Sequence, residues 1–461
     1  MKRLFLSIAV SLLTLTVSFA QSCFDSRHIV CSFGVVSDVH IDSPDGAPAT
    51  KFRSALQQLK DRAALDDSDG LDAVLVAGDL VNTPWKSEEF YSQVDYFKSC
   101  YETVLNPEET PLIYTPGNHD TYRWWTPETV SQAKNISSRL GTEYFLTDID
   151  NEARERMECR HCIVGEYHIL SLVPIGARPV TYPSEALEWL DRQLSDITSE
   201  DSSRYVLLIT HPMIYDTVYG SMLGDYWATS ALSGILEKYP QVVTFSGHLH
   251  FPLNDPRSIW QGRFTALGCG SVRYMAIEDG QYEDMRSKTV MKDCDEFSQG
   301  LLVQFDRKGN MRVTRMDFYH KGAIGKPWTV QYPETDGSHL LTYSFPGRRA
   351  VNRPPHLGSI RIVNGLHDGS SSVGIRFHKA YDDEFVHHYV IDVTSSDTLV
   401  VRKKLLADFY KHCNPLQMKK VWTVDLGQLK PGTYKVSVVA FDSWGSESNT
   451  VYRTFKISGN E

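Results

Sequence analysis

The stretch Pro111-Leu112-Ile113-Tyr114, followed shortly by Gly117-Asn118-His119-Asp120, is one of five places where a short apolar run leads into a compact polar motif. The other four motifs, each with its apolar run in parentheses, are Asp38-Val39-His40 (34–37), Gly78-Asp79 (73–77), His211 (206–209) and Gly247-His248-Leu249-His250 (242–245). Short apolar runs bounded by polar residues are typical of buried strands. The pattern predicts five such strands that deliver polar side chains to one edge of a sheet, where loops carry function.

The polar residues of these motifs are types that bind metal ions. Asp, His and Asn offer the oxygen and nitrogen donors that suit Zn, Mn or Fe, and Cys does not occur among them. Asp38 and His40 lie two positions apart, so an extended backbone would direct both side chains to the same side, where they could bind one ion. We therefore expect a mixed oxygen and nitrogen site that holds two divalent metal ions.

The order of the five motifs resembles the signature DxH, GD, GNH(D/E), H, GHxH of the calcineurin-like metallophosphoesterases, over roughly residues 34 to 345. The resemblance implies an α/β fold, a four-layer α/β/β/α sandwich. It also implies that Asp79 bridges two ions, with the first completed by Asp38, His40 and His250 and the second by Asn118, His211 and His248.

By the same resemblance, the chain hydrolyses phosphomonoesters or phosphodiesters by attack of a metal-bridging hydroxide. Two ions about 3.5 to 4 Å apart ionise the bridging water and hold the phosphate oxygens, so no covalent enzyme intermediate is needed. His119, beside the ligand Asn118, matches the family position that protonates the leaving oxygen, and an imidazole can do so near neutral pH. Asp120 is expected to be a turn residue only.

Position 82, three residues after Asp79, narrows the choice within this family. Purple acid phosphatases carry there a tyrosine that binds ferric iron, and protein serine/threonine phosphatases carry an aspartate that orients the catalytic histidine. This chain has Asn82, which disfavours both classes. The nearer resemblance is to the cyclic-nucleotide-phosphodiesterase-like and related broad-specificity branch. Four aromatic residues near the motifs could stack on a base or sugar, or be packed inside: Trp85, Tyr122, Trp124 and Trp125.

The first 20 residues are typical of a secretory signal peptide. Lys2 and Arg3 precede an apolar segment that is too short for a stable membrane span, and small residues lead to Ala20. We expect cleavage after Ala20 and a secreted, periplasmic or cell-surface protein. A lipid anchor on Cys23 is the less favoured alternative, because Ala-Gln-Ser is a poor sequence ahead of a lipidated cysteine.

Charge and hydropathy disfavour several partners. Loss of Lys2 and Arg3 with the signal peptide takes the net charge from −10 to −12, and an acidic protein is repelled by nucleic acid and by anionic membranes. No later stretch is apolar enough for a transmembrane helix. We therefore expect a small phosphoester as substrate, with no specific nucleic-acid binding and no transmembrane segment.

Eight cysteines occur in the chain, and in an exported protein they can oxidise. Eight cysteines permit 105 pairings, among which the sequence cannot choose. For Cys159-Arg160-His161-Cys162, a local disulfide or two structural thiols are favoured over a zinc knuckle or redox pair, because the motif has no partner CxxC.

The organisation of the chain predicts two domains after the signal peptide at 1–20. In residues 21–350, assigned to the metallophosphoesterase domain, helices are expected at 52–65, 88–105, 185–194 and 230–237, and a β-hairpin over 300–318 is expected to complete the second sheet. Residues 346–355 are typical of a linker. Residues 351–461 are β-rich, and 429–446 resemble the last two strands of a fibronectin type III or immunoglobulin-like sandwich, with Tyr434 as a tyrosine corner.

Other functions stay open at this point. The chain could be a nucleotidase or a sphingomyelinase-like phospholipid hydrolase, since the motifs do not reveal the groups that grip the rest of the substrate. It could also be a glycan-binding or surface-binding protein with a vestigial metal site, although all seven predicted ligands are present. We expect the β-rich domain to be a spacer or lid outside the chemistry.

Overall fold

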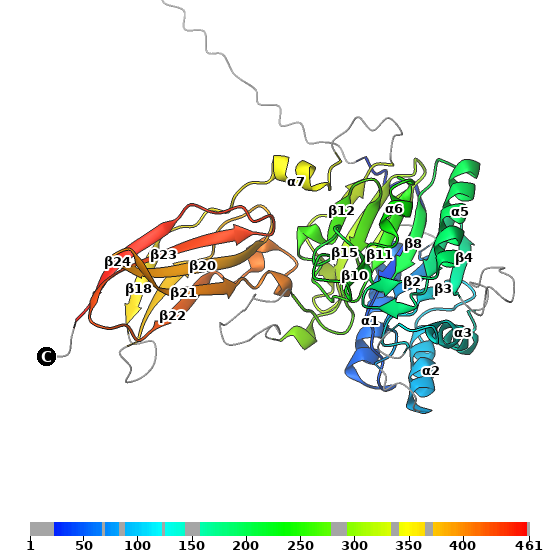
Figure 1. The fold of residues 1–461 in the computed structure, drawn as a ribbon, viewed down its shortest axis with the longest axis horizontal. Coiled ribbons are helices and arrows are strands. Elements are labelled where there is room, and N and C mark those ends of the chain that lie inside the picture. Colours follow the sequence, from blue (N-terminus) through cyan, green and yellow to red (C-terminus); the bar gives the residue numbers. More distant parts are fainter. Residues whose placement is uncertain are drawn as a thin grey trace, which may run out of the picture.

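The computed structural model describes residues 23–66, 70–82, 88–121, 125–142, 157–277, 293–332, 341–364 and 372–458. The predicted signal peptide and the aromatic residues Trp85, Tyr122 and Trp124 lie outside these ranges. The chain folds into an α/β part, which contains all five motifs, and a C-terminal β part beside it (Figure 1).

A first sheet of seven strands carries three of the motifs at its strand ends. Its strands are β1 (Ile29–Val36), β2 (Ala73–Ala77), β3 (Leu112–Thr115), β14 (Gln299–Asp306), β15 (Met311–Asp317), β16 (Gly322–Ala323) and β17 (Trp328–Val330). They run in the order β16-β15-β14-β1-β2-β3, and β17 pairs with β15. β1, β2 and β3 are parallel neighbours, whereas β14 is antiparallel to β1.

Three helices accompany this sheet: α1 (Ala47–Asp66), α2 (Glu88–Glu102) and α3 (Thr129–Leu140). Phe52 of α1 and Phe97 of α2 stack with ring centroids 4.7 Å apart, in one buried cluster with Val74 and Val76 of β2. The helices predicted at 52–65 and 88–105 are therefore confirmed, with α1 beginning earlier, at Ala47.

A second sheet of six strands carries the other two motifs. Its strands are β4 (Cys159–Val164), β5 (Tyr167–Leu172), β8 (Val206–Thr210), β11 (Val242–Ser246), β12 (Ile259–Gln261) and β13 (Thr265–Gly268), in the order β12-β13-β11-β8-β5-β4. Trp189 and Leu194 of helix α5 (Ser184–Glu200) cluster with Leu208 of β8. The helix predicted at 185–194 is confirmed, and at 230–237 a shorter helix forms, α6 (Ser233–Leu236).

Alternate residues of the central strands face different cores, as the pleat of a strand requires. In β2, Leu75 lies in a buried cluster together with Leu207 of β8, whereas Val76 lies in the cluster with α1 and α2. In β8, Leu208 lies in the cluster with α5. Each of these strands therefore has one face toward the other sheet and one toward helices.

The motifs come from two sheets, and not from one sheet edge as the sequence suggested. β1, β2 and β3 belong to the first sheet, and β8 and β11 to the second. The hairpin of β14 and β15 is confirmed, but the prediction that it completes the second sheet is wrong, because β14 pairs with β1. β1 pairs with β2 along one edge and with β14 of the hairpin along the other. Apolar runs alone do not show which strands are partners.

The Cys159-to-Cys162 motif lies along β4. Cys159 belongs to the cluster under α5, whereas Cys162 packs against the cluster between the sheets. Residues three apart on a strand point to opposite faces. The two thiols therefore cannot pair with each other, and of the two favoured alternatives the local disulfide is wrong.

Shorter elements occupy the loops: β6 (Gly176–Ala177), β7 (Val180–Thr181), β9 (Met213–Ile214), β10 (Ala228–Thr229), and the single 3-10 turns η2 (Pro256–Ser258) and η3 (Cys294–Glu296). β6 pairs with β7, and β9 pairs with β10. Among the described residues, none of the helices has the length and apolar character that crossing a membrane requires.

The connection between the two parts contains a helix where a linker was predicted. Helix α7 (Phe345–Val351) occupies the first half of the segment 346–355. The Ser344 side chain caps it by accepting a hydrogen bond from the Gly347 amide at 3.1 Å, and Pro346 lies in the first turn, where no N–H is needed. The turn-forming residues thus start a helix here.

The C-terminal part consists of two small antiparallel sheets. The first contains β18 (Ile360–Asn364), β19 (Val373–His378) and β22 (Val421–Gly427), in that order; the second contains β21 (Thr398–Leu406), β20 (Val386–Ser395), β23 (Gly432–Asp442) and β24 (Val451–Ile457), in that order. The Tyr434 hydroxyl donates a hydrogen bond to the Lys430 carbonyl oxygen at 2.8 Å, which confirms the predicted tyrosine corner.

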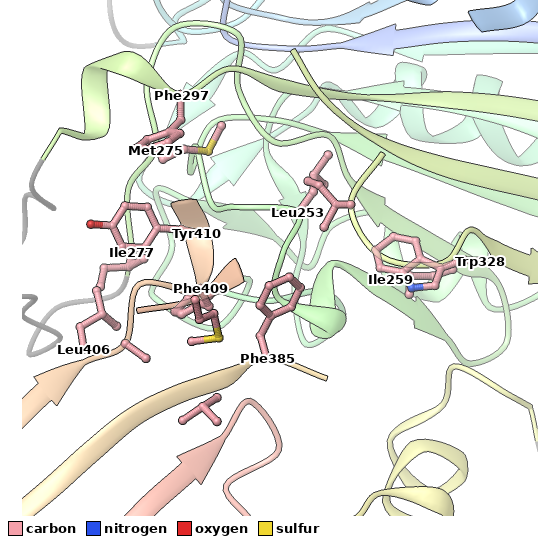
Figure 2. Close-up of a cluster of buried hydrophobic side chains, with 14 of the residues drawn as sticks. Leu253, Ile259, Met275, Ile277, Phe297, Trp328, Phe385, Leu406, Phe409 and Tyr410 are labelled. Carbon is pink, nitrogen blue, oxygen red and sulfur yellow. The ribbon is translucent and has the colours of Figure 1, made fainter. Parts of the chain in front are cut away.

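A continuous apolar interface joins the two parts. Figure 2 shows side chains of one buried cluster that spans it: Phe385, Leu406, Phe409 and Tyr410 from the C-terminal part, and Met275, Ile277 and Phe297 from the α/β part. Phe409 and Tyr410 lie in the turn η4 (Phe409–Lys411), which precedes the turn η5 (Pro415–Gln417). The Asn254 side-chain amide donates to the His412 carbonyl oxygen at 2.7 Å. The interface therefore combines apolar burial with polar contacts.

Candidate metal centre

Seven polar side chains meet at the ends of five strands. Each lies in the loop after its strand: Asp38 and His40 after β1, Asp79 after β2, Asn118 after β3, His211 after β8, and His248 and His250 after β11. All seven are buried, with at most 5% of any residue exposed. The structure thus brings together every residue that the sequence proposed as a ligand.

The first group of donor atoms consists of Asp38, His40 and His250, next to Asp79. Asp38 Oδ1 lies 3.1 Å from His250 Nε2. His40 Nε2 lies 3.3 Å from His250 Nε2 and 3.6 Å from Asp79 Oδ2. Donors that share one ion at about 2.0 to 2.2 Å lie about 3 Å from one another, so this group fits one divalent ion.

The second group consists of Asp79, Asn118, His211 and His248. His211 Nε2 lies 3.3 Å from Asp79 Oδ2 and 3.2 Å from Asn118 Oδ1. A ring nitrogen of His248 lies within 4.8 Å of the donor atoms of Asp79 and His211. Asp79 is therefore common to both groups, where a bridging ligand belongs.

Hydrogen bonds on the far side of three imidazole rings orient their nitrogens. Backbone carbonyl oxygens accept from His211 Nδ1 (Ala77, 2.7 Å), His250 Nδ1 (Tyr274, 3.1 Å) and His248 Nε2 (Tyr226, 3.1 Å). A carbonyl oxygen only accepts, so each of these nitrogens carries the proton and the opposite nitrogen keeps its lone pair. His211 and His250 therefore present Nε2 to the site, and His248 presents Nδ1.

Five of the seven residues have a left-handed backbone. The φ angles are 53° at Asp38, 52° at His40, 54° at Asp79, 75° at His248 and 58° at His250. Non-glycine residues rarely adopt this region, although Asp and His do so more often than most, and such strain concentrates at functional sites. The prediction that an extended backbone aligns Asp38 and His40 is therefore wrong: β1 ends at Val36, and a left-handed loop aligns them.

Two motif glycines are required by close approach to the ligands. A Cβ atom at Gly117 would overlap the Asp79 carboxylate, and one at Gly247 would overlap Ser37 and the Asp38 carboxylate. Contacts this close leave no room for a side chain. These two glycines therefore allow the loops after β3 and β11 to approach the carboxylates of Asp79 and Asp38 closely.

The electrostatics of the site favour metal binding. Burial opposes the charge on Asp79, but His211 and His119 outweigh it and hold the pKa of Asp79 well below its ordinary value. Burial lowers the pKa of His40 and His248 to about 3 each. Burial also opposes the charge on His211, but Asp79 outweighs it and raises the pKa of His211 to about 9. Ionised carboxylates and neutral imidazoles are the forms that bind metal, and a cation would take the place of the His211 proton.

His119 lies beside the first group and is more exposed than the seven ligand candidates. Its ring centroid is 4.6 Å from that of His40, and its backbone amide donates to Asp79 Oδ1 at 2.8 Å. Its Nδ1 lies 3.5 Å from the Asn82 carbonyl oxygen. The ring is thus held at the edge of the site, where a substrate can reach it.

Asp120 does more than form a turn, so the prediction for this residue is wrong. Its fully buried carboxylate accepts hydrogen bonds from the amides of Leu80 at 2.8 Å, Val81 at 3.1 Å and Gly117 at 2.7 Å. These amides belong to the loops after β2 and β3. Asp120 therefore ties together the loops that carry Asp79 and Asn118.

Aromatic rings enclose the donors. The ring centroids of Trp125, Tyr226 and Trp227 lie 5.4, 4.8 and 4.8 Å from that of His248, and the Tyr274 ring lies 4.1 Å from His250. Trp125 is only 2% exposed, so it packs against the ligands and does not stack on a substrate. Tyr226, Trp227 and Tyr274 could not be predicted from the motifs, because none of them lies in one. The adjacent aromatic residues at 226 and 227 are the one signal in the sequence.

The calcineurin-like phosphoesterase family matches residues 31–252, a range that holds all five motifs. These residues form a calcineurin-like metallophosphoesterase domain, and the chain is a metal-dependent phosphoester hydrolase. The family uses a dinuclear metal site, and the two groups of donors around Asp79 are the residues that could hold it.

Several solved structures are similar to the chain. A dimetal phosphatase from Danio rerio is 13% identical, with 66% of this chain and 100% of that chain covered and a TM-score of 0.46. A purple acid phosphatase from yellow lupin (Lupinus luteus) seeds is 15% identical, with 70% and 57% covered and a TM-score of 0.46. A protein from Thermus thermophilus is 12% identical, with 66% and 100% covered and a TM-score of 0.32. Among curated protein sequences, none matches.

Proposed function

We propose that this chain is an exported phosphoesterase that uses two divalent ions, of Zn, Mn or Fe, to hydrolyse a phosphomonoester or phosphodiester of modest size. The position of Asp79 carries the proposal: its Oδ2 lies 3.6 Å from His40 Nε2 and 3.3 Å from His211 Nε2, between the two donor groups. When bound, the ions would neutralise charge on the phosphate and supply an activated water.

The protein's own residues hold this arrangement in place. The seven ligand candidates are buried, and the carbonyl oxygens of Ala77, Tyr274 and Tyr226 fix three of the imidazole rings. Phosphoryl transfer needs mainly positioning and neutralisation of charge. Fixed donors in a buried site make that neutralisation strong, because they need little reorganisation during the reaction.

His119 is the residue that we assign to protonation of the leaving oxygen. The Asn82 carbonyl oxygen, 3.5 Å from His119 Nδ1, favours a proton on that nitrogen and leaves Nε2 for the substrate. Among the histidines of the site, it is the one with an exposed edge. A general acid has to reach the leaving group, so this exposure supports the role.

Asn82 supports placement in the cyclic-nucleotide-phosphodiesterase-like branch. The residue is exposed, and its backbone N–H donates to the Ile41 carbonyl oxygen at 2.9 Å. Because residue 82 is an asparagine, it offers no tyrosine oxygen to an ion. The protein should therefore be colourless when isolated with its metals. A nucleotidase and a phospholipid hydrolase would share this centre, and only their substrates separate them.

We further propose that residues 1–20 are a secretory signal and that residues 351–461 form a fibronectin type III-like domain after a domain at 21–350. The arrangement of three strands, β18-β19-β22, against four, β21-β20-β23-β24, supports the second assignment, as does the tyrosine corner at Tyr434. Mass spectrometry of the mature protein would show whether cleavage follows Ala20 or whether Cys23 carries a lipid.

Metal analysis tests the centre. Protein purified without chelator should hold two divalent ions per chain at these ligands, and the variant Asp79→Ala should lose both, because both groups depend on that carboxylate. His161→Asn is a control at a half-buried histidine on β4 that is not a ligand candidate, and this variant should keep both ions. A wild-type protein that stays free of Zn, Mn and Fe at these ligands after reconstitution would refute the proposal and favour the glycan-binding alternative.

A substrate panel tests the chemistry. Wild-type protein should hydrolyse at least one class among phosphomonoesters, cyclic or linear phosphodiesters, nucleotides and phospholipids. The variant His119→Asn should keep its metals and lose about a hundredfold or more in turnover on a poor leaving group. An activated nitrophenyl ester should lose less, because its leaving oxygen needs no proton. Equal losses on both substrates would remove the general-acid role.

A further inference from the structure

A second group of possible metal ligands lies at the junction of the two parts. Asp317 is the last residue of β15, His320 lies in the turn that follows, and Cys413 comes from the C-terminal part, between η4 and η5. One donor atom from each lies within 4.8 Å of the others. This group shares no residue with the centre around Asp79.

The spacing of these donors suits a tetrahedral ion. Cys413 Sγ lies 3.6 Å from Asp317 Oδ2, and His320 Nδ1 lies 2.9 Å from the same oxygen. With Zn–S at about 2.3 Å and Zn–O and Zn–N at about 2.0 Å, tetrahedral angles place sulfur and oxygen about 3.5 Å apart and nitrogen and oxygen about 3.3 Å apart. The first distance fits already, and the second requires the His320 ring to move by a few tenths of an ångström.

The burial of the Asp317 side chain favours a cation at this place. Asp317 is fully buried, and within the described ranges its one ion-pair partner is His320, which carries a charge only when it is protonated. A buried carboxylate normally has a basic partner or a metal. The other oxygen of Asp317 already accepts a hydrogen bond from the His320 amide at 3.0 Å.

Both sides of the group are held by the backbone. Asp317 pairs with Gly322 of β16, which fixes the turn that contains His320. The Gly325 amide donates to the Cys413 carbonyl oxygen at 2.8 Å, which fixes the cysteine from the other part of the chain. The donors are thus positioned before any ion binds, so little ordering of the chain would accompany binding.

We propose that Asp317, His320 and Cys413 bind one zinc-class divalent ion, with water as the fourth ligand, and that this ion fastens the C-terminal part to the α/β part. A thiolate, an imidazole and a carboxylate together are a zinc-type set. The His320 side chain is 37% exposed, which leaves one side of the group open to the water ligand. The proposal does not depend on the function assigned to the centre around Asp79.

Binding has to displace the thiol proton. Burial and the Asp317 charge raise the pKa of Cys413 to about 12 when no ion is present. A bound cation reverses this preference, because metals bind the thiolate and release its proton.

Cobalt(II) distinguishes this site from the dinuclear centre, because a cobalt–thiolate bond gives a strong near-ultraviolet charge-transfer band and the other centre contains no cysteine. Wild-type protein reconstituted with cobalt should bind three ions per chain and show the band. Cys413→Ser should bind two ions, lack the band and keep its hydrolytic activity. The control Cys162→Ser, at a half-buried cysteine on β4, should behave like the wild type.

A second variant guards against misfolding of Cys413→Ser. His320→Gln changes an exposed side chain, so it should fold, and it should lose the third ion while the two others stay bound. Metal addition should raise the melting temperature of chelated wild-type protein more than that of either variant. Equal cobalt stoichiometry and equal near-ultraviolet spectra in wild type and both variants would overturn the proposal.

Discussion

The left-handed backbone at some of the metal ligands predicts that glycine and alanine variants differ in stability in opposite directions at His40 and His211. His40 has a φ of 52°, whereas His211 is absent from the residues with positive φ. An alanine at position 40 keeps the strain, which is about 1 to 2 kcal/mol for an L-residue, and a glycine removes it. Elsewhere glycine destabilises by about 0.5 to 1 kcal/mol relative to alanine.

At position 40 the two effects oppose each other, so we expect metal-free His40→Gly to be more stable than metal-free His40→Ala by about 1 kcal/mol. At position 211 glycine brings only its entropic cost, and His211→Ala should be the more stable variant by about 0.5 to 1 kcal/mol. Both positions are buried ligand candidates, so each glycine and alanine pair loses the same imidazole and the same metal contact.

Urea unfolding in the presence of chelator measures these differences, and the nine tryptophans of the chain report the transition by fluorescence. Within each glycine and alanine pair, the urea concentrations at the midpoints of unfolding are compared, provided that the two variants have the same dependence of unfolding free energy on urea concentration. If alanine is more stable than glycine at both positions by the same amount, the left-handed backbone at His40 carries no strain and the reasoning fails.

Three other predictions follow from the structure. Asp120→Ala leaves the buried amides of Leu80, Val81 and Gly117 without an acceptor, so the variant should lose at least about 3 kcal/mol of unfolding free energy in urea; a loss under about 1 kcal/mol would contradict this. Phe409→Ala, at a fully buried interface residue, should cost about 3 to 5 kcal/mol in the same assay or expose the junction to limited proteolysis. Burial lowers the pKa of His388 to about 3, whereas the residue in the unfolded chain takes up a proton near pH 6.5, so folding stability should fall as the pH falls from about 6.5 toward 3. The variant His388→Phe keeps an aromatic ring stacked on Phe441 but cannot take up a proton. It should flatten this part of the curve of melting temperature against pH.

The strands and the candidate ligands could be predicted because the relevant signals are local. Runs such as 73–77 are fully buried and end directly at a polar motif, so both the strand and the place of its ligand can be read from a few residues. The spacing of apolar residues likewise predicts α1 and α2. Five such local signals in a family order were sufficient to identify the residues that the structure then brings within a few ångströms of one another.

The features that could not be predicted depend on residues far apart in the chain. The partner of β14 depends on which edge of β1 is open, and the role of Asp120 depends on amides 3 to 40 residues away. The rings of Tyr226 and Tyr274 approach the ligand histidines through loops without a motif. The left-handed angles at Asp38 and His40 occur in the loop after β1, and a pattern of apolar and polar residues does not record φ.

The C-terminal part was expected to be a spacer or lid outside the chemistry, but its interface with the α/β part involves a segment that holds a ligand candidate. The Tyr274 carbonyl oxygen accepts from His250 Nδ1, and the Ala276 amide donates to the His250 carbonyl oxygen at 3.0 Å, so residues 274–276 hold one ligand candidate of the first donor group. Met275 and Ile277 of the same segment pack in the cluster that contains Phe409 and Tyr410 (Figure 2). A spacer would need no such contact, and a mobile lid would not bury a large apolar interface. We infer that the C-terminal part supports the segment that orients His250, although none of its described residues is a ligand candidate of that centre.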